Sequence, residues 1–324
     1  MSLMISIIMP VFNTLNEIDE AILSILNQSY KNFELVIVND GSTYKTLKHL
    51  KYWELKDKRI IILNQENMGQ AYARINGLKL ARGDIVTFVD SDDLVSTDYL
   101  KHLTMGFIND SIDITAVKYR KFKNNIITNI NHNNYTKKVF DSHSYLYRVL
   151  LYNNGNYNVG FWGKAFRKDF LTKQSLPKGH VYEDLAAMPE IISSARKIYW
   201  IDSYDYFYRY RKNSTTKSYS NEKYQDLLWA LDKVKTLVNK NSYLYNPYKV
   251  LVFNHLTFFW IWSIKNKKKY DDIVKKIDSI SLSFLYNCLL KGIHVSIKGL
   301  FLLTIYRKCN FAFSFVSNIF CYYL

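Results

Sequence analysis

Four short apolar runs, each joined to the next by a helical pattern, constrain the fold of this 324-residue chain more than any other feature. The runs occupy residues 5–9, 33–38, 59–63 and 84–89. After the first run, which Pro10 is expected to end, apolar side chains recur at helical spacing behind Asn16, the expected N-cap. Strands that are apolar throughout and separated by single helices need cover on both faces, as in a parallel sheet. The first half of the chain is therefore predicted to be a Rossmann-like α/β unit.

Acidic side chains follow two of these predicted strands. The run DSDD occupies residues 90–93, and Asp40 stands in the turn sequence NDGS. The carboxyl ends of strands in an open α/β sheet face the crevice where ligands bind, and two carboxylates one residue apart can share a divalent cation. The acidic run is also compatible with a simple capping role, in which Ser96 or Thr97 opens a helix over residues 99–107.

The composition narrows the class of protein. The hydrophobic content of 48% excludes a disordered chain, and the net charge of +16 calls for a polyanionic partner or surface. Nucleic acid, anionic lipid and nucleotide phosphates all qualify. The three cysteines lack metal-ligand spacing, so we expect reduced residues in a cytoplasmic protein. The apolar start of the chain lacks a basic n-region and a cleavage site, which indicates a strand rather than a signal peptide.

Common nucleotide-binding signatures are missing from the sequence. No Gly-x-Gly-x-x-Gly follows the first run, and no Gly-x4-Gly-Lys-Ser/Thr occurs anywhere. A sugar nucleotidyltransferase would need a glycine-rich loop with Arg and Lys after the first strand, and PVFNTLNEID offers none. A non-enzymatic nucleic-acid-binding protein that uses the positive charge stays open as an alternative.

Three longer stretches resemble a known family. The stretches ISIIMPVFN, SILNQSYKNFELVIVNDGS and NMGQAYARINGLKLARGDIVTFVDSDD resemble the nucleotide-binding half of the family 2 glycosyltransferases. The resemblance is dense over residues 5–105 and resumes at 161–184. It implies the GT-A fold, an α/β fold with a mostly parallel sheet flanked by helices and, here, a helical C-terminal extension. The implied domains are a catalytic domain (1–218, with a nucleotide-sugar-binding half 1–110 and an acceptor half 111–218) and a helical, basic region (219–324).

The resemblance also implies roles for residues of the donor site. Pro10 and Phe12 match the loop that lies against the nucleobase and ribose, and Asp40 matches the carboxylate that binds uracil. A uracil N3–H is a donor, which suits an ionised Asp. Asp90 and Asp92 match the family's Asp-x-Asp motif. Asp90 would then face the ribose and diphosphate, and Asp92 would ligate Mn²⁺ or Mg²⁺.

A second cluster, FWGKAFRKDFL followed by LPKGHVYEDL, resembles the family's acceptor segment. In that pattern Asp184 is the general base, and Glu183 precedes it at a helix start where the dipole favours the ionised form. An acidic pair that merely stabilises the helix dipole is the alternative. Trp162 is a candidate for stacking on a sugar ring or for the core, and Lys164 for holding a phosphate or a sugar hydroxyl.

The remaining third has a different character. Arg209 and Arg211 lie on one face of a predicted strand and could bind a diphosphate, although solvated surface positions are the alternative. From residue 221 the pattern is helical, and the apolar stretch 250–264 is shorter than the roughly 20 residues that span a bilayer. Residues 284–324 contain basic and apolar residues but no acid, which favours a helix on an anionic membrane face, with packing or a homo-oligomer interface as the alternative.

The resemblance implies an inverting, metal-dependent transferase. It would move a hexose from a UDP-sugar to a saccharide acceptor, with a polyprenyl-pyrophosphate-linked acceptor expected. The resemblance implies a setting in bacterial capsule, O-antigen or other surface polysaccharide synthesis. We expect a cytoplasmic protein, peripheral on the inner face of the membrane, with no nucleic-acid partner.

Overall fold

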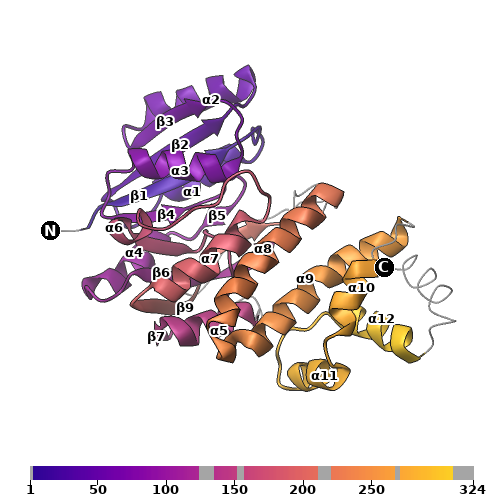
Figure 1. The fold of residues 1–324 in the computed structure, drawn as a ribbon. Coiled ribbons are helices and arrows are strands. Elements are labelled where there is room, and N and C mark those ends of the chain that lie inside the picture. Colours follow the sequence, from indigo (N-terminus) through magenta and orange to yellow (C-terminus); the bar gives the residue numbers. More distant parts are fainter. Residues whose placement is uncertain (1–2, 124–134, 152–156, 211–219, 267–270, 309–324) are drawn as a thin grey trace. The chain divides into compact units, whose positions relative to one another are not determined.

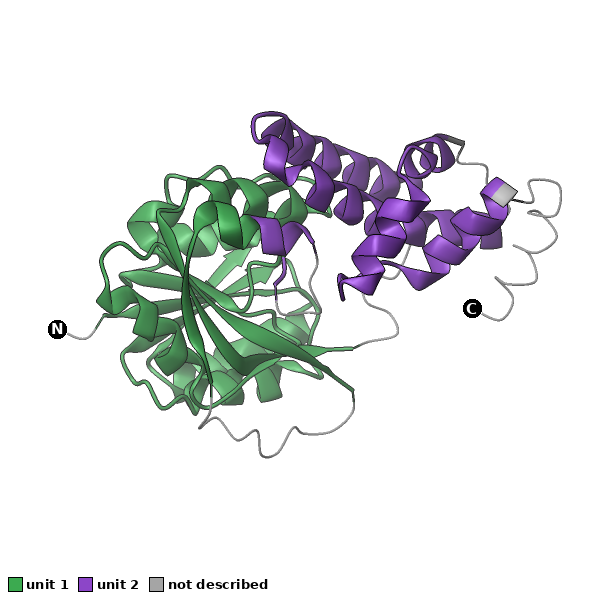
Figure 2. Cartoon of the chain, turned by 90° about the horizontal axis from the view of Figure 1, so that it is seen from below, with its two compact units in different colours: residues 1–146, 159–214 green, residues 147–158, 215–324 purple. Residues whose placement is uncertain are grey.

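The computed structural model describes residues 3–123, 135–151, 157–210, 220–266 and 271–308 (Figure 1). The chain forms two compact units, which Figure 2 distinguishes by colour. Unit 1 comprises Met1–Leu146 and Val159–Ser214, and unit 2 comprises Tyr147–Asn158 and Thr215–Leu324. The structure therefore divides the chain into a mixed α/β unit and a helical unit.

Unit 1 is built on a nine-stranded sheet with the order β3-β2-β1-β4-β8-β6-β9-β5, and β7 pairs with β9. The strands are β1 (Ile5–Val11), β2 (Phe33–Asp40), β3 (Ile60–Gln65), β4 (Ile85–Phe88), β5 (Leu94–Val95), β6 (Ile114–Phe122), β7 (Lys137–Asp141), β8 (Lys164–Arg167) and β9 (Lys197–Arg209). The first four strands pair in parallel, as the apolar runs predict. Their side chains are almost entirely buried in β1, β2 and β4, because helices cover both faces.

The second half of the sheet is mixed in direction. β8 runs antiparallel to both β4 and β6, β9 runs antiparallel to β5 and β7, and only β6 and β9 pair in parallel. The expected architecture, α/β with a large sheet flanked by helices and a helical C-terminal part, is confirmed, but its parallel character is confined largely to β1–β4. β8 has only four residues, too few for an alternating pattern to reveal a strand.

The end of β1 differs from the sequence expectation for a physical reason. Pro10 was expected to end this strand, yet β1 continues to Val11. Its partner β4 pairs only as far as Ile8, so beyond that point β1 has a neighbour on one side alone. A proline without an N–H is tolerated there because no ladder bond to β4 is lost.

The helices of unit 1 connect the strands and cover the sheet. They are α1 (Ile18–Leu26), α2 (Tyr44–Lys56), α3 (Gln70–Leu80), α4 (Tyr99–Met105), the 3₁₀ turn η1 (Gly106–Ile108), α5 (Ser142–Leu150, whose last residues belong to unit 2), α6 (Lys168–Leu171) and α7 (Glu183–Ser194). α3 lies directly on β1 and β2 (Figure 1). A Cβ at Gly77 would stand 2.5 Å from Ile8 Cγ2, so this close approach of helix to sheet requires glycine.

Two expected N-caps are wrong. The residue before α1 is Glu17, not Asn16, and its side chain makes no capping hydrogen bond. α4 starts after Asp98 rather than after Ser96 or Thr97. The Ser96 hydroxyl instead donates to the buried carboxylate of Asp205 on β9 (2.5 Å), because tertiary burial offers it a charged acceptor.

The described residues of unit 2 form helices joined by turns and short loops. Its helices are α8 (Asn221–Asn239), the 3₁₀ turn η3 (Ser242–Leu244), α9 (Tyr245–Lys265), α10 (Asp271–Asp278), α11 (Leu282–Leu290) and α12 (Ile297–Lys308). α9 is the central helix, and α8, α10 and α12 pack against it. In the part of the chain that the structure describes, no helix is both long and apolar enough to cross a bilayer.

Candidate active site

The acidic run after β4 forms a tight, buried turn. Tyr206 of β9 receives a hydrogen bond from the Asp90 N–H (3.2 Å) and donates its own hydroxyl to Asp93 (2.7 Å). Burial raises the pKa of Tyr206 well above its ordinary value, so the phenol keeps the proton that it donates. Asp93 is 1% exposed and also accepts from the Arg209 N–H (2.7 Å). β9 thus holds the acidic turn in place.

The carboxylates of this turn act on one another electrostatically. Burial first, and then the negative charges of Asp92 and Asp90, raise the pKa of Asp93 well above its ordinary value. Among the described residues, no group of three or more His, Cys, Asp or Glu side chains could hold a metal ion alone. Mg²⁺ and similar hard cations are commonly bound by one or two carboxylates together with substrate phosphates. The partly exposed Asp92 fits a cation held jointly with a diphosphate.

Arg209, a candidate diphosphate ligand, is engaged within the protein. Its Nε donates to the main-chain carbonyl of Asp92 (2.6 Å), and its Nη2 donates to Glu20 (2.5 Å). The guanidinium also lies 4.7 Å from the ring centroid of Phe122. Arg209 therefore fixes the backbone of the acidic turn. The other candidate, Arg211, lies outside the described residues.

Asp40 lies at the carboxyl end of β2 and is 3% exposed. Its Oδ1 accepts from the Met68 N–H (2.9 Å) and from Gln65 Nε2 (2.7 Å), and its Oδ2 accepts from the Gly69 N–H (2.9 Å). These bonds fix the loop between β3 and α3. A carboxylate has about four lone-pair sites, so three bonds leave capacity for one further donor. The role of Asp40 toward uracil stays a prediction.

The two candidate residues of the first loop lie in different settings. Pro10 is half-buried in β1, opposite Val38 of β2. Phe12 follows the strand and is 48% exposed, which is unusual for a phenylalanine so close to a buried strand. Its ring is accessible for stacking on a planar group. The structure thus places Phe12 at the same edge of the sheet as Asp40 and Asp90, at the carboxyl ends of adjacent parallel strands.

A buried arginine joins the turn after β4 to the start of α7. Arg74 of α3 is 4% exposed, and its Nη2 lies 3.2 Å from Asp90 Oδ1 while its Nη1 lies 2.7 Å from Glu183 Oε1. Gln70, one turn earlier, donates to the same Glu183 oxygen (2.5 Å). Glu183 is 2% exposed, and its second oxygen has no hydrogen-bond partner among the described residues. Arg74 and Glu183, 109 positions apart in the sequence, therefore belong to one ionic network.

Asp184 follows Glu183 in the first turn of α7 and is only partly buried. Its Oδ1 accepts from the Leu185 N–H (2.7 Å). The expectation that the helix N-terminus keeps this group readily ionised is wrong. Burial chiefly, and the adjacent Glu183 charge next, raise the pKa of Asp184 to about 7, although Arg74 acts to lower it. Loss of water outweighs the helix dipole at this position.

Trp162 and Lys164 both point into the protein. Trp162 stacks on Tyr206, with centroids 4.9 Å apart and planes 19° apart, and meets Tyr119 edge-on at 4.7 Å. Lys164 is 1% exposed, and its ammonium donates to the Gly160 carbonyl (2.7 Å). Burial lowers the pKa of Lys164 to about 7, although the charge of Asp184 acts to raise it. Trp162 therefore packs against Tyr206, whose hydroxyl is hydrogen-bonded to the acidic turn.

Comparison with known proteins agrees with this arrangement. Residues 6–172, just over half of the chain, match the family described as "Glycosyl transferase family 2". The chain is a family 2 glycosyltransferase. Membership of this family sets aside the two alternatives, a non-enzymatic nucleic-acid-binding protein and a sugar nucleotidyltransferase.

Two curated relatives of this glycosyltransferase come from Streptococcus pneumoniae serotype 4. "Glycosyltransferase GlyA" is 30% identical over 246 residues, which are 74% of this chain but only 35% of GlyA. "Glycosyltransferase GlyG" is 27% identical over 254 residues, 75% of this chain and 81% of GlyG. Among solved structures, S. aureus TarS residues 1–349 in complex with UDP-GlcNAc is similar with a TM-score of 0.65 and 18% identity, covering 98% of this chain and 90% of TarS. At that identity the likeness to TarS shows the fold alone.

The candidate site includes residues to which sequence reasoning gave no role of their own. Arg74 is the main one, together with Tyr206 and Asp93. A signal for Arg74 exists, because positions 71, 74 and 78 share one buried face of α3 and a charged residue there is rare. Tyr206 carried no comparable signal, since it stands in a run of alternating aromatic residues on β9.

Proposed function

We propose that this chain transfers a hexose from a UDP-sugar to a hydroxyl group of a saccharide acceptor, with inversion at the anomeric carbon. The observation that carries the proposal is the ionic network of Arg74, which holds the donor-side carboxylate Asp90 and the acceptor-side Glu183 on one guanidinium. Asp184, the candidate base, follows Glu183 directly. A donor and an acceptor bound on the two sides of Arg74 would therefore meet.

The donor side suits a nucleoside diphosphate sugar. Phe12 offers an exposed ring for the base, Asp40 offers an acceptor for the uracil N3–H, and Asp90 lies next to where the ribose and diphosphate would run. Pro10 would shape the same loop. The similar protein TarS has been solved with UDP-GlcNAc and with UDP, which supports a UDP-linked donor for this chain.

The acidic turn would hold the cation. Asp92 is the proposed ligand of Mn²⁺ or Mg²⁺, because its partly exposed carboxylate lies in the same acidic turn as Asp90 and Asp93. When bound, the cation would neutralise charge that builds up on the diphosphate leaving group. Arg209 would contribute by fixing the Asp92 carbonyl, and hence the turn, rather than by touching the diphosphate.

Asp184 would act as the general base. Its carboxylate removes the proton of the acceptor hydroxyl while the acceptor oxygen forms a bond to the anomeric carbon and the bond from that carbon to UDP breaks on the opposite face. One displacement of this kind inverts the configuration. A base with a pKa near the working pH, as for Asp184 at about 7, combines basicity with a substantial ionised fraction. Lys164 is buried near Asp184, and its charge would influence the pKa of Asp184. Trp162 would support the acidic turn by stacking on Tyr206.

The acceptor and setting are the least specified parts of the proposal. A saccharide linked to a polyprenyl pyrophosphate, in capsule, O-antigen or other bacterial surface polysaccharide synthesis, agrees with the basic composition of the chain. We propose a cytoplasmic location, peripheral on the inner membrane face. A homo-oligomer built through the C-terminal region is the alternative use of that region.

The proposal is tested by calorimetric titration of UDP with and without Mn²⁺. We expect binding that requires the metal and that Asp92→Ala abolishes, while the control Asp110→Ala, at a fully exposed carboxylate, leaves binding unchanged. The anomeric configuration of the product, read by NMR with donor sugars screened in turn, tests inversion. Absence of UDP binding in every condition would overturn the choice of donor, and a retained configuration would overturn the single displacement.

A further inference from the structure

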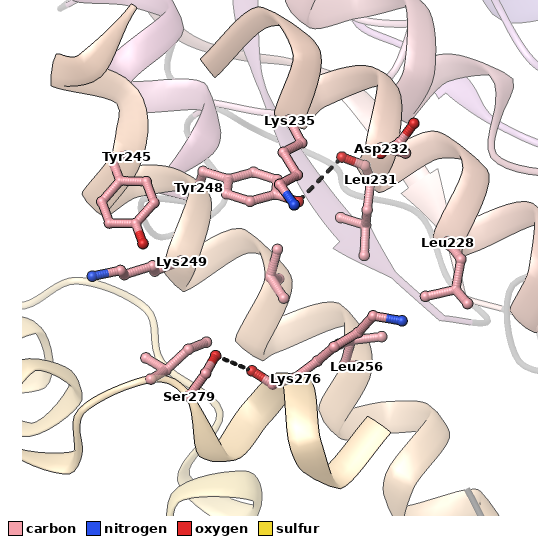
Figure 3. A pocket seen from close by; sticks show the side chains of 12 residues that line it. Leu228, Leu231, Asp232, Lys235, Tyr245, Tyr248, Lys249, Leu256, Lys276 and Ser279 are labelled. Atoms are coloured by element: carbon pink, nitrogen blue, oxygen red, sulfur yellow. Dashed lines mark hydrogen bonds between the residues drawn. The ribbon is translucent and has the colours of Figure 1, made fainter. Parts of the chain in front are cut away.

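A pocket of about 510 Å³ opens inside unit 2, between α8, α9 and α10 (Figure 3). Its inner surface is apolar and is formed mainly by Leu228, Leu231, Val252, Leu256 and Ile280. Figure 3 shows the leucines of α8 reaching from one wall toward Leu256 on the other. Pockets that bind small molecules are typically about 300–1,000 Å³ and mostly apolar, so this cavity has the size and lining of a ligand site.

Each of the three helices adds a lysine to this apolar pocket. Lys235 comes from α8, Lys249 from α9 and Lys276 from α10, against a single acidic lining residue, Asp232. Lys276 lies 3.7 Å from Asp272, an exposed pair that weakly offsets its charge. For the other two lysines, no ion pair exists among the residues that the structure describes. The lining therefore carries net positive charge beside a hydrocarbon-like interior.

The two tyrosines of the pocket lie where polar and apolar parts meet. Tyr248 donates its hydroxyl to the Leu231 carbonyl (3.3 Å), and burial together with the charge of Asp232 raises its pKa to about 12, so it stays neutral. Tyr245 is 55% exposed, and the Lys249 ammonium stands 4.2 Å from its ring centroid. This cation–π contact holds the Lys249 ammonium beside the Tyr245 ring.

We propose that this pocket binds one amphiphile that has a hydrocarbon chain and a phosphate head. The chain would lie between Leu231 and Leu256, and the head would lie against Lys235, Lys249 and Lys276. A free phosphate would leave the apolar interior unused, and a neutral hydrocarbon would leave Lys235 and Lys249 without an ion pair among the described residues. An anionic glycerophospholipid and an isoprenyl phosphate share this chemistry. The inference does not depend on the transfer reaction and would survive its failure.

The test is calorimetric binding of soluble probes to the full-length protein. The probes are farnesyl phosphate, a short-chain lysophosphatidylglycerol, farnesol and inorganic phosphate. We expect binding of at least one phosphate-bearing amphiphile, at least tenfold weaker binding of farnesol, and no binding of inorganic phosphate. The preferred amphiphile identifies the source of the ligand. Binding of farnesol as tight as that of farnesyl phosphate, or binding of neither amphiphile, would overturn the proposal.

Matched charge variants locate the site. The pocket triple Lys235→Gln, Lys249→Gln and Lys276→Gln removes three charges from the lining. The control triple Lys233→Gln, Lys265→Gln and Lys275→Gln removes three exposed charges from the same three helices outside the pocket. Lysines beside an anionic head contribute roughly 1 kcal/mol each, so we expect the pocket triple to weaken binding by about a hundredfold. The control triple should change it less than about twofold.

A variant with a larger side chain tests the apolar part of the pocket. Val252→Trp places an indole ring in the pocket. Because Val252 is partly exposed, we expect the variant to fold normally. It should reduce binding of the amphiphile at least tenfold and leave the thermal unfolding of the protein unchanged. Equal loss of binding in the two lysine triples, or full binding by Val252→Trp, would show that the ligand sits elsewhere on a positive surface.

Discussion

At the scale of single residues, Asp184 differs from the other carboxylates because substrate can reach its side chain although burial raises its pKa. It is partly exposed, so a substrate can reach it, yet its pKa lies about three units above that of an ordinary aspartate. Perturbed carboxylates of this kind concentrate at functional sites. Asp93, in contrast, has a raised pKa but is fully enclosed by Tyr206 and the Arg209 backbone, which fits a structural role.

The base assignment predicts the effect of Asp184→Asn. The amide keeps the size and the hydrogen bond from the Leu185 N–H but cannot take a proton. We expect transfer to fall by roughly 10²- to 10⁴-fold, the range of general-base assistance, with UDP binding retained. Product formation and UDP calorimetry measure the two effects. Glu190→Gln, at an exposed position of the same helix, is the control, and full activity of Asp184→Asn would refute the assignment.

The raised pKa of Asp184 also predicts the pH dependence. Only the ionised carboxylate accepts a proton, so kcat/KM should be high above pH 7 and fall about tenfold per unit below it. The neighbouring Glu183 charge helps to raise this pKa. Glu183→Gln should therefore shift the acidic limb of the profile to lower pH, whatever it does to the maximal rate. A limb near pH 4 in the wild type, or a shift to higher pH in the variant, would contradict the electrostatics.

Much of the candidate site could be predicted from single residues, but the interactions between those residues could not. Asp40, Asp90, Asp92 and Asp184 were found because they follow strands or start a helix in a recognisable order. Their pKa values and partners depend on which groups tertiary folding removes from water, and a linear sequence does not contain that distance information. The ionised state expected for Asp184 was wrong for this reason.

At the scale of elements, Arg74 is the link between three segments: α3, the turn after β4, and the start of α7. The strands β1–β4 were predictable because fully apolar runs have a clear length and turn signals at both ends. β8 was not, since it is short and its partners come from distant parts of the chain. Sequence reasoning therefore recovered the parallel strands β1–β4 and missed β8, which attaches the later strands to them.

Replacing Arg74 tests this link. Arg74→Met keeps much of the side-chain volume but leaves the buried Glu183 carboxylate without its cation. Removal of one partner of a buried ion pair typically destabilises by about 3–5 kcal/mol, and we expect that loss in urea denaturation. Adding Glu183→Gln should restore part of the lost stability, because the buried carboxylate that has no cation is then replaced by a neutral amide. The pair would not be coupled if Arg74→Met lowered the free energy of unfolding by less than about 1 kcal/mol. The same would follow if the effects of the two substitutions simply added in the double variant.

The contact of α3 with the sheet is tested by Gly77→Ala. In an exposed helix this change stabilises by roughly 0.5–1 kcal/mol. Here the new Cβ would stand 2.5 Å from Ile8 Cγ2 and 3.1 Å from Val38 Cγ2, inside a packed layer. We therefore expect destabilisation of about 1–3 kcal/mol, the usual effect of overpacking. The sign of the change is decisive, since stabilisation in thermal or urea unfolding would mean that α3 does not lie this close to β1 and β2.

At the scale of the whole molecule, the dominant property is the net charge of +16. This charge suits the phosphate-bearing substrates of a glycosyltransferase, and we propose anionic lipid as a second partner. Deleting the C-terminal helix would be a poor test of lipid association, because Gly299 of α12 lies against Thr257 of α9 and its removal would uncover a buried face. A change of solution conditions leaves the fold intact and acts on the charge directly.

We therefore expect the protein to co-sediment with vesicles that contain phosphatidylglycerol and to be released by salt. Each Lys or Arg near such a surface contributes about 1 kcal/mol, and raising the salt from about 0.1 M to 1 M shortens the Debye length from about 10 Å to about 3 Å. Charge-driven association should then be largely lost, whereas insertion of an apolar helix would resist salt. Phosphatidylcholine vesicles are the control and should retain little protein. Equal retention on both kinds of vesicle, or retention that 1 M salt does not reduce, would mean that the positive charge does not serve membrane association.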